Sequence, residues 1–260
     1  MGFGVIVNPG SSPFSAGQFR RQFLSNLLTI TGDTRVLWMP QATDTTTSLD
    51  ETRYPHTFTA DASMTLVAQG SGYSRAFNGS SQYLTTPDVA ELTFGNGTVD
   101  SAFSIVAVAN VTNTAAARTI ISKNNTSQGE WYFQVQADDT LLFTLADQSV
   151  PAVTFRASNS AITQGSWGML GGSYDGTGGA TAANGIALYQ NGISIASTAT
   201  NSASYVAMED KTAPIEIGSI TAHTASFFQG SLAMVAVCQK NLSASDHWAI
   251  WQLCRGYFNL

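Results

Sequence analysis

The amino-acid sequence predicts a mainly β protein, an antiparallel two-sheet sandwich with a short N-terminal helix and a C-terminal helix. The first observation is the stretch 167–195, where Asp175-Gly176 and Asn191-Gly192 interrupt apolar segments and accept the positive φ angles of tight turns. The second is composition, because only 11% of the residues are charged and the Lys and Glu of exposed helix faces are scarce. Turn signals recur at short spacing elsewhere, which favours a sandwich over a parallel sheet with helical crossovers.

The expected strands follow one another from residue 35 onward. The segment 103–111 holds small and apolar residues throughout, as expected for a strand in the middle of a sheet. Within 130–136, Trp131, Phe133 and Val135 alternate with Tyr and Gln, and this period of two predicts a strand with one buried face. The other expected strands lie at 35–39, 65–68, 73–77, 82–85, 119–123, 141–145, 152–156, within 167–195, at 215–219 and at 227–238.

A helix is expected after an arm of Gly, Pro and Ser at residues 1–14. Ser15 is placed to cap the helix and Gly32-Asp33 to end it. Its apolar face consists of Phe19, Phe23, Leu24, Leu27 and Leu28. A helix of this length is marginal alone in water, so the face must pack either on the chain's own sandwich or on a larger assembly. Both alternatives stay open.

A second helix closes the chain. Ser243, followed three residues later by Asp246, approximates a capping box. The apolar surface of this helix comes from Trp248, Ile250, Trp251, Leu253 and Cys254. We therefore expect two segments: 1–34, an arm and amphipathic helix for docking or oligomerisation, and 35–260, the sandwich.

Charge and composition exclude several classes of protein. The 260 residues carry a formal net charge of −6 and show no basic patch, so nucleic acid is not an expected partner. No apolar run approaches the roughly 20 residues that cross a bilayer, and the N-terminus lacks the pattern of a signal peptide. We expect a soluble protein made in a cytoplasm. Cys238 and Cys254 are too few for a disulfide framework and are expected to be buried thiols.

The order of several short motifs over 35–256 resembles the laminin G-like, concanavalin A-like lectin/glucanase jelly roll. The matching segments are RAFNGSSQYL at 75–84, FSI at 103–105, IISK at 120–123, Trp167, YDG at 174–176, LYQNG at 188–192, IG at 217–218, FQGSL at 228–232 and LS at 242–243. The glycines suit turns, and Trp167 and Tyr189 are expected in the core between the sheets. Gly171-Gly172 is expected to permit close approach of a neighbouring strand or side chain. We interpret these motifs as scaffold, since one fold hosts many functions.

Catalysis is not expected from the sequence. The superfamily members that cleave β-glucans carry alternating acids, Glu-x-Asp-x-Glu, on one strand, and no such run exists here. The three histidines lie far apart in the sequence and have no metal-ligand spacing. No cofactor is expected, although the resemblance leaves calcium open, because many lectin-like sandwiches bind it in loops. The candidate ligands are Asp88, Asp147 and Asp175.

Three functions are weighed from these observations. The first is a structural protein of a virus particle, as decoration, cement or tail component of a tailed bacteriophage. It would be a homo-oligomer that meets other virion proteins through the N-terminal arm and through Phe19, Phe23, Leu24 and Leu27. The second is a carbohydrate-binding module for host-surface glycans, with Asn124, Asn125, Trp131 and Tyr205 as candidate contacts. The third is a glycoside hydrolase with distant acids that converge. We favour the first, with the second as alternative.

Overall fold

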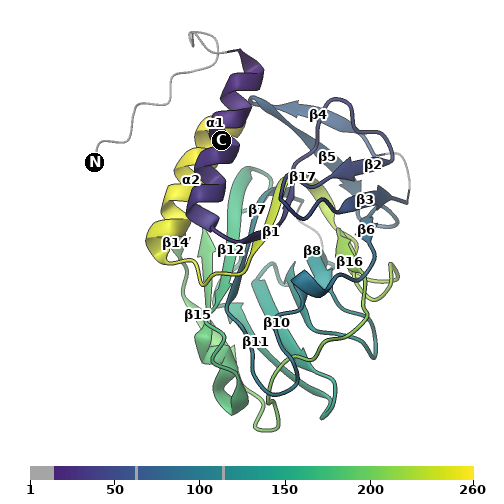
Figure 1. The fold of residues 1–260 in the computed structure, drawn as a ribbon, viewed down its shortest axis with the longest axis vertical. Coiled ribbons are helices and arrows are strands. Elements are labelled where there is room, and N and C mark those ends of the chain that lie inside the picture. The colour runs from purple at the N-terminus through teal and green to yellow at the C-terminus, as the bar shows by residue number, and fades with distance from the viewer. Residues whose placement is uncertain (1–14, 62–63, 113–114) are drawn as a thin grey trace.

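Two antiparallel sheets stack face to face, and two helices lie together against the outer side of one of them (Figure 1). The computed structural model describes residues 15–61, 64–112 and 115–260. The predicted fold class, a mainly β jelly-roll sandwich with a helix near each end of the chain, is confirmed. The expected arm at 1–14 lies outside the described residues.

The first sheet, within the described residues, has the strand order β14-β13-β12-β7-β17-β5-β4, and β1 also pairs with β17. Its central strands β7 and β12 run antiparallel in unbroken register from Trp167 opposite Asn110 to Tyr174 opposite Phe103. The strands of this sheet are β1 (Thr34–Trp38), β4 (Leu66–Gln69), β5 (Gly72–Asn78), β7 (Phe103–Val111), β12 (Trp167–Tyr174), β13 (Ile186–Gln190), β14 (Ile193–Ser194) and β17 (Gln229–Cys238).

The second sheet has the order β15-β11-β10-β9-β8-β16-β6-β3-β2 in the described part of the chain. In β9, Trp131, Phe133 and Val135 are buried and the residues between them are half-buried, which confirms the alternation expected from the sequence. The strands are β2 (Thr47–Leu49), β3 (Thr57–Ala60), β6 (Leu84–Thr86), β8 (Arg118–Lys123), β9 (Trp131–Val135), β10 (Leu141–Asp147), β11 (Ala152–Ser158), β15 (Ser197–Thr200) and β16 (Ile215–Ile217). Two short 3₁₀ helices, η1 (Ala90–Leu92) and η2 (Gly179–Gly185), lie in connections between strands.

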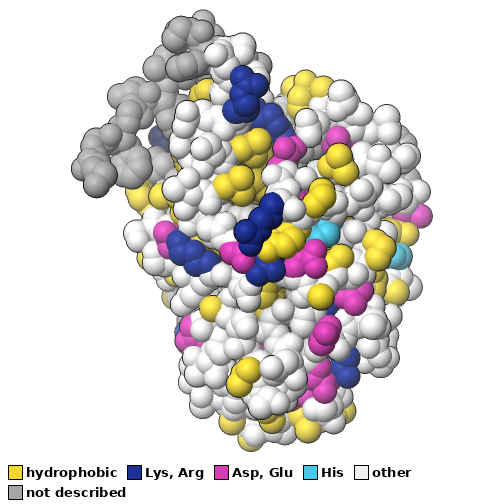
Figure 2. Space-filling view, in the orientation of Figure 1, with side chains coloured by type: hydrophobic (Ala, Val, Ile, Leu, Met, Phe, Trp, Pro, Cys, Tyr) yellow, Lys and Arg dark blue, Asp and Glu magenta, His cyan; other side chains and the backbone are white. Residues whose placement is uncertain are grey.

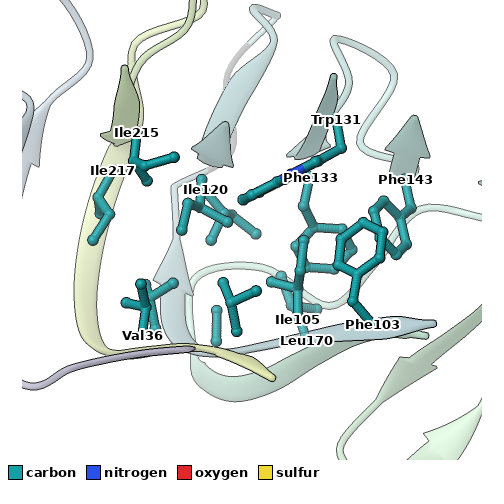
Figure 3. Packing of buried hydrophobic residues seen from close by; sticks show 14 of the residues in the cluster. Val36, Phe103, Ile105, Ile120, Trp131, Phe133, Phe143, Leu170, Ile215 and Ile217 are labelled. Carbon is teal, nitrogen blue, oxygen red and sulfur yellow. The ribbon is translucent and has the colours of Figure 1, made fainter. Parts of the chain in front are cut away.

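Aromatic and aliphatic side chains fill the space between the sheets (Figure 3). Phe103 of β7 lies at the centre, with its ring stacked 4.1 Å from that of Phe94 and at right angles to that of Phe143 at 5.2 Å. Edge-to-face and stacked pairs are the arrangements that aromatic quadrupoles favour. The main hydrophobic core therefore joins the two sheets through large, well-packed side chains.

A second core lies between the first sheet and the helices α1 (Ala16–Thr31) and α2 (Ala244–Phe258). Both helices begin at a complete capping box, Ser15 with Gln18 and Ser243 with Asp246, and Gly32 ends α1 as predicted. The second core includes both predicted thiols: Cys238 and Cys254 are buried and free.

The N-terminal helix packs on its own sandwich, which is the first of the two alternatives that the sequence left open. Phe23 and Leu27 are buried in the second core, and the Phe23 ring stacks 4.2 Å from that of Tyr257 in α2. Phe19 and Leu24 are half-buried against the same cluster. Docking to another protein through these four residues would have to break this packing. Neither helix of the described residues is long and apolar enough to cross a membrane.

Trp167 and Tyr189 correct one expectation, because neither lies between the sheets. Tyr189 stacks 3.8 Å from the ring of His247 in α2, and Trp167 packs half-buried against the second core. Both are therefore on the outer face of the first sheet. The reason is that this sheet is covered on both faces, so either face of a strand accepts apolar side chains.

The glycine pair in β12 serves close approach, as expected. A Cβ on Gly171 would lie 2.7 Å from Cε1 and Nδ1 of His247, and one on Gly172 would lie 2.8 Å from Cδ1 of Phe143. Because neighbouring residues of a strand face opposite ways, the pair lets α2 approach one face of the sheet and the second sheet approach the other.

Candidate functional site

A groove lies where the chain passes from one sheet to the other at the lateral edge of the sandwich. Strand β13 turns through Asn191 and Gly192, both with positive φ, into β14, which confirms the predicted two-residue turn. Ile195 and Ala196 then connect β14, the edge of the first sheet, to β15, the edge of the second. Figure 1 shows β14 and β15 on the same side of the molecule. We call the depression beside this connection the lateral groove.

The lateral groove is an open depression of about 450 Å³ lined by both polar and apolar residues. A smaller depression of about 270 Å³ lies on the other side of the same connection, and Ile195 and Ala196 line both. The residues that line the lateral groove are Arg156, Asn159, Asn184, Ile186, Ala187, Leu188, Ser194, Ile195, Ala196 and Ser197.

Arg156 extends from β11 into the groove and is held there by neutral oxygens. Its Nε donates to Ser197 Oγ at 2.7 Å, its Nη2 to the Ser197 carbonyl at 3.3 Å, and its Nη1 to the Ala183 carbonyl at 3.3 Å. A guanidinium has five N–H bonds, so two remain without a described acceptor. The side chain is half-buried, and its planar fork is fixed in orientation by contacts to both sides of the groove.

Two asparagines add further fixed amides at the rim. Asn159 Oδ1 accepts a bond from the Thr198 hydroxyl at 2.7 Å, and Asn184 Oδ1 accepts from Asn201 Nδ2 at 3.0 Å. With each amide oxygen engaged, the Nδ2 groups of Asn159 and Asn184 stay available as donors at the exposed rim.

The lining contains no acid or base that titrates near neutral pH. Arg156 is its only ionisable side chain among the described residues. Hydrolysis of a glycosidic bond by the usual route needs a pair of carboxyl groups that flank the bond. The described lining of the lateral groove therefore offers no group for acid–base catalysis.

A buried carboxylate cluster lies elsewhere, at the loop end of β8 and β9. The Lys123 ammonium contacts a Glu130 carboxylate oxygen and lies 2.9 Å from Asp88 Oδ1. Burial raises the pKa of Glu130 to about 7, although the charge of Lys123 acts to lower it. Lys123 and Glu130 are both fully buried, so the pair has no access to a ligand.

The calcium candidates are not brought together. Asp88 pairs with Lys123, Asp147 accepts from the backbone N–H groups of Ser149 and Val206, and Asp175 accepts from Thr177. Within residues 15–61, 64–112 and 115–260, no group of three or more His, Cys, Asp or Glu side chains is placed to hold a metal ion. Asp175 thus shapes its turn, but that turn opens a connection spanning 175–185 that includes η2, rather than a two-residue hairpin.

The predicted glycan contacts lie outside the lateral groove. Trp131 is fully buried, with its indole N–H donating to the Leu92 carbonyl at 3.0 Å. Tyr205 is buried as well, and its hydroxyl donates to Asp100 at 2.8 Å. Neither ring offers a face to a sugar, because both are occupied by the core. Asn124 and Asn125 are half-buried in the turn between β8 and β9.

Sequence reasoning missed Arg156, although the sequence holds a signal for it. Between Asp147 and Glu209 the only charged residues are Arg156 and Asp175. A single arginine in so long a stretch of mostly uncharged residues is unusual, and this isolation could have identified Arg156 as a candidate site residue. The rest of the groove gave no such signal, because its residues come together only through the connection between the sheets.

The fold and the groove together define a lectin-like jelly-roll domain. A family model described as the concanavalin A-like lectin/glucanases superfamily matches residues 78–246, well over half of the chain, and the chain belongs to this superfamily. No curated protein sequence matches it.

Solved structures with the same fold come from toxin binding domains. The binding domain of Paraclostridial Mosquitocidal Protein 1 gives a TM-score of 0.63 at 12% identity, over 85% of this chain and 52% of that one. The botulinum neurotoxin serotype G binding domain gives 0.63 at 14%, over 85% and 51%. The serotype D ligand-binding domain in complex with N-acetylneuraminic acid gives 0.61 at 12%, over 87% and 52%. This chain thus spans about half the length of these structures, and the likeness shows a shared fold.

Proposed function

We propose that the chain is a non-catalytic binding module that holds saccharides in the lateral groove. The observation that carries the proposal is the lining, in which amide and guanidinium donors and serine hydroxyls accompany the partly exposed apolar side chains of Ala187 and Ile195. Saccharides present hydroxyl groups around rings with apolar C–H faces, and this lining complements both.

The superfamily supports a saccharide as the ligand, since its members include lectins and glucanases. The absence of a carboxylate, histidine or cysteine from the described lining favours binding over hydrolysis. One structure of similar fold contains N-acetylneuraminic acid. That ligand belongs to a chain of which this one matches about half, so it supports saccharides as a class and no particular binding position.

A bulky substitution in the groove tests this proposal. Ala196 is exposed and lines both depressions, so Ala196→Trp fills the groove without disturbing the core. Ala42→Trp is the matched control, because Ala42 is exposed in the loop before β2, at the opposite edge of the second sheet from β15. Binding is read on a glycan array and by saturation-transfer NMR with the best ligands. We expect Ala196→Trp to weaken binding by at least about tenfold, or about 1.4 kcal/mol, and Ala42→Trp to leave it unchanged.

We also propose that this module serves as a homo-oligomeric structural protein of a virus particle, present in the virion after synthesis in the host cytoplasm. The support is the sequence: a low-charge, lectin-like domain preceded by a Gly, Pro and Ser arm. Because Phe23 and Leu27 are buried in the domain's own second core, the arm at 1–14 is the better candidate for contact with other virion proteins. Deletion of 1–14 should abolish incorporation into particles and leave the fold intact. Normal incorporation would contradict an arm-mediated anchor.

A further inference from the structure

We infer that the lateral groove selects saccharides that carry a carboxylate or sulfate group, and that Arg156 binds this anionic group. The inference rests on the proposed function, since it names the class of saccharide for the same groove. It is argued from the charge state, orientation and surroundings of one side chain.

Arg156 is a half-buried cation without a counter-charge among the residues that the structure describes. Five other arginines form ion pairs with carboxylates: Arg20, Arg35, Arg53, Arg75 and Arg118. Arg21 and Arg255 have no carboxylate partner in the described chain either, but both are exposed on helices, where water solvates them. Arg156 instead lies in a depression, and its hydrogen bonds within the described chain go to a hydroxyl and two carbonyl oxygens. In a protein with 17 acidic and 11 basic residues, this absence of a partner is a specific feature of the site.

The contacts of Arg156 prepare it for an anion that accepts hydrogen bonds through two oxygens. Bonds to Ser197 on β15 and to the Ala183 carbonyl in η2 hold the guanidinium from two sides, which removes part of the entropy cost of ordering it on binding. Two N–H bonds remain for a ligand. A carboxylate or sulfate accepts such paired donors through two oxygens, and bonds of this kind are about twice as strong as neutral ones.

The other groups of the groove fit the remainder of a sugar acid. Asn159 and Asn184 offer amide donors on the same rim, and Ile195 and Ala196 offer exposed apolar surface to the ring. No carboxylate among the described lining residues would repel an anion. On the face drawn in Figure 2, most charged side chains lie in a band across the middle and along one side, where Lys and Arg adjoin Asp and Glu. The rest of that face is largely uncharged.

The test is a binding comparison between matched ligands. The full chain is titrated with sialyllactose and lactose, with a hyaluronan tetrasaccharide and its carboxyl-reduced form, and with a sulfated oligosaccharide and its desulfated form. We expect at least one acidic member to bind about tenfold or more tightly than its neutral counterpart. Arg156→Gln should abolish this preference, and Arg21→Gln, which removes an exposed unpaired arginine outside the groove, should preserve it.

A second variant keeps the test decisive if Arg156→Gln does not fold. Ser194 is exposed and lines the groove, so Ser194→Asp places a carboxylate beside the ligand and should weaken the acidic members more than their neutral counterparts. Equal binding of acidic and neutral members would overturn the inference and leave the proposed function standing. A preference that survives Arg156→Gln would overturn the role of Arg156. Absence of binding to any saccharide would overturn the proposed function itself.

Discussion

His247 is a buried histidine that makes stability depend on pH. Its ring stacks on Tyr189, its Nε2 lies 2.8 Å from Ser173 Oγ, and its Nδ1 has no partner. Burial lowers the pKa of His247 to about 4, against the opposing charge of Asp246, from an unfolded value near 6.5. The neutral ring is therefore favoured in the folded state. Its contribution to stability is complete above pH 6.5 and is lost as the pH falls towards 4.

We expect His247→Gln, which can keep a hydrogen bond to Ser173 and does not titrate, to remove this dependence. The advantage of the wild type over the variant in free energy of unfolding should shrink by about 2 kcal/mol between pH 7 and pH 4.5. Urea unfolding of both proteins at each pH measures the difference. Comparing the two proteins cancels the opposite effect of Glu130, whose raised pKa makes stability fall as the pH rises from about 4.5 to 7. Parallel stability curves for the two proteins would refute the assignment to His247.

At the scale of elements, β12 is a strand that α2 approaches closely on one face and the second sheet approaches closely on the other. Gly171→Ala should lower the free energy of unfolding by about 1–3 kcal/mol, because its Cβ would meet the buried His247 ring at 2.7 Å. Gly17→Ala in the first turn of α1 is the matched control, since its Cβ meets nothing within 4 Å. There the change should stabilise by up to about 1 kcal/mol. Thermal and urea unfolding report both, and a neutral Gly171→Ala would mean that α2 is free to move outward.

The helix α1 allows a second test of the same layer. Leu27 has no exposed surface, so Leu27→Ala should cost about 2–5 kcal/mol of stability. Ser25→Ala, at an exposed position on the same helix, should change stability by less than about 0.5 kcal/mol. A helix that served only as an external anchor would tolerate both substitutions equally, and that result in urea unfolding would contradict the packing described above.

The sequence predicted local elements well because their signals are local. The Asn191-Gly192 turn and the alternation in β9 depend on residues adjacent in the chain. The face of the sheet that buries Tyr189 could not be predicted, since a period of two assigns residues to faces without saying which face meets the helices. The lateral groove was missed for a related reason: Arg156, Asn184 and Ser194 meet only through the order of the strands.

For the whole molecule, β7 links the two cores into one structure. Ile105, Ala107 and Ala109 point into the core between the sheets, and Val106 and Val108 point into the core beneath the helices. Because a single strand contributes alternate residues to both, neither core can be lost while the other keeps its full packing. The outer helix layer is therefore expected to unfold together with the sandwich.

This coupling predicts one cooperative transition for the full chain. The calorimetric and van't Hoff enthalpies should agree, and amides of α1, α2 and β7 should exchange with deuterium through the same global opening. Leu27→Ala should lower the midpoint of that single transition, since the damage to the helix layer is shared with the sheets. Two separate transitions, or exchange of α1 long before β7, would instead show that residues 1–34 form a unit that detaches from the sandwich. Such detachment would return the apolar face of α1 to the role of a docking surface, because Phe23 and Leu27 would then be released without unfolding the domain.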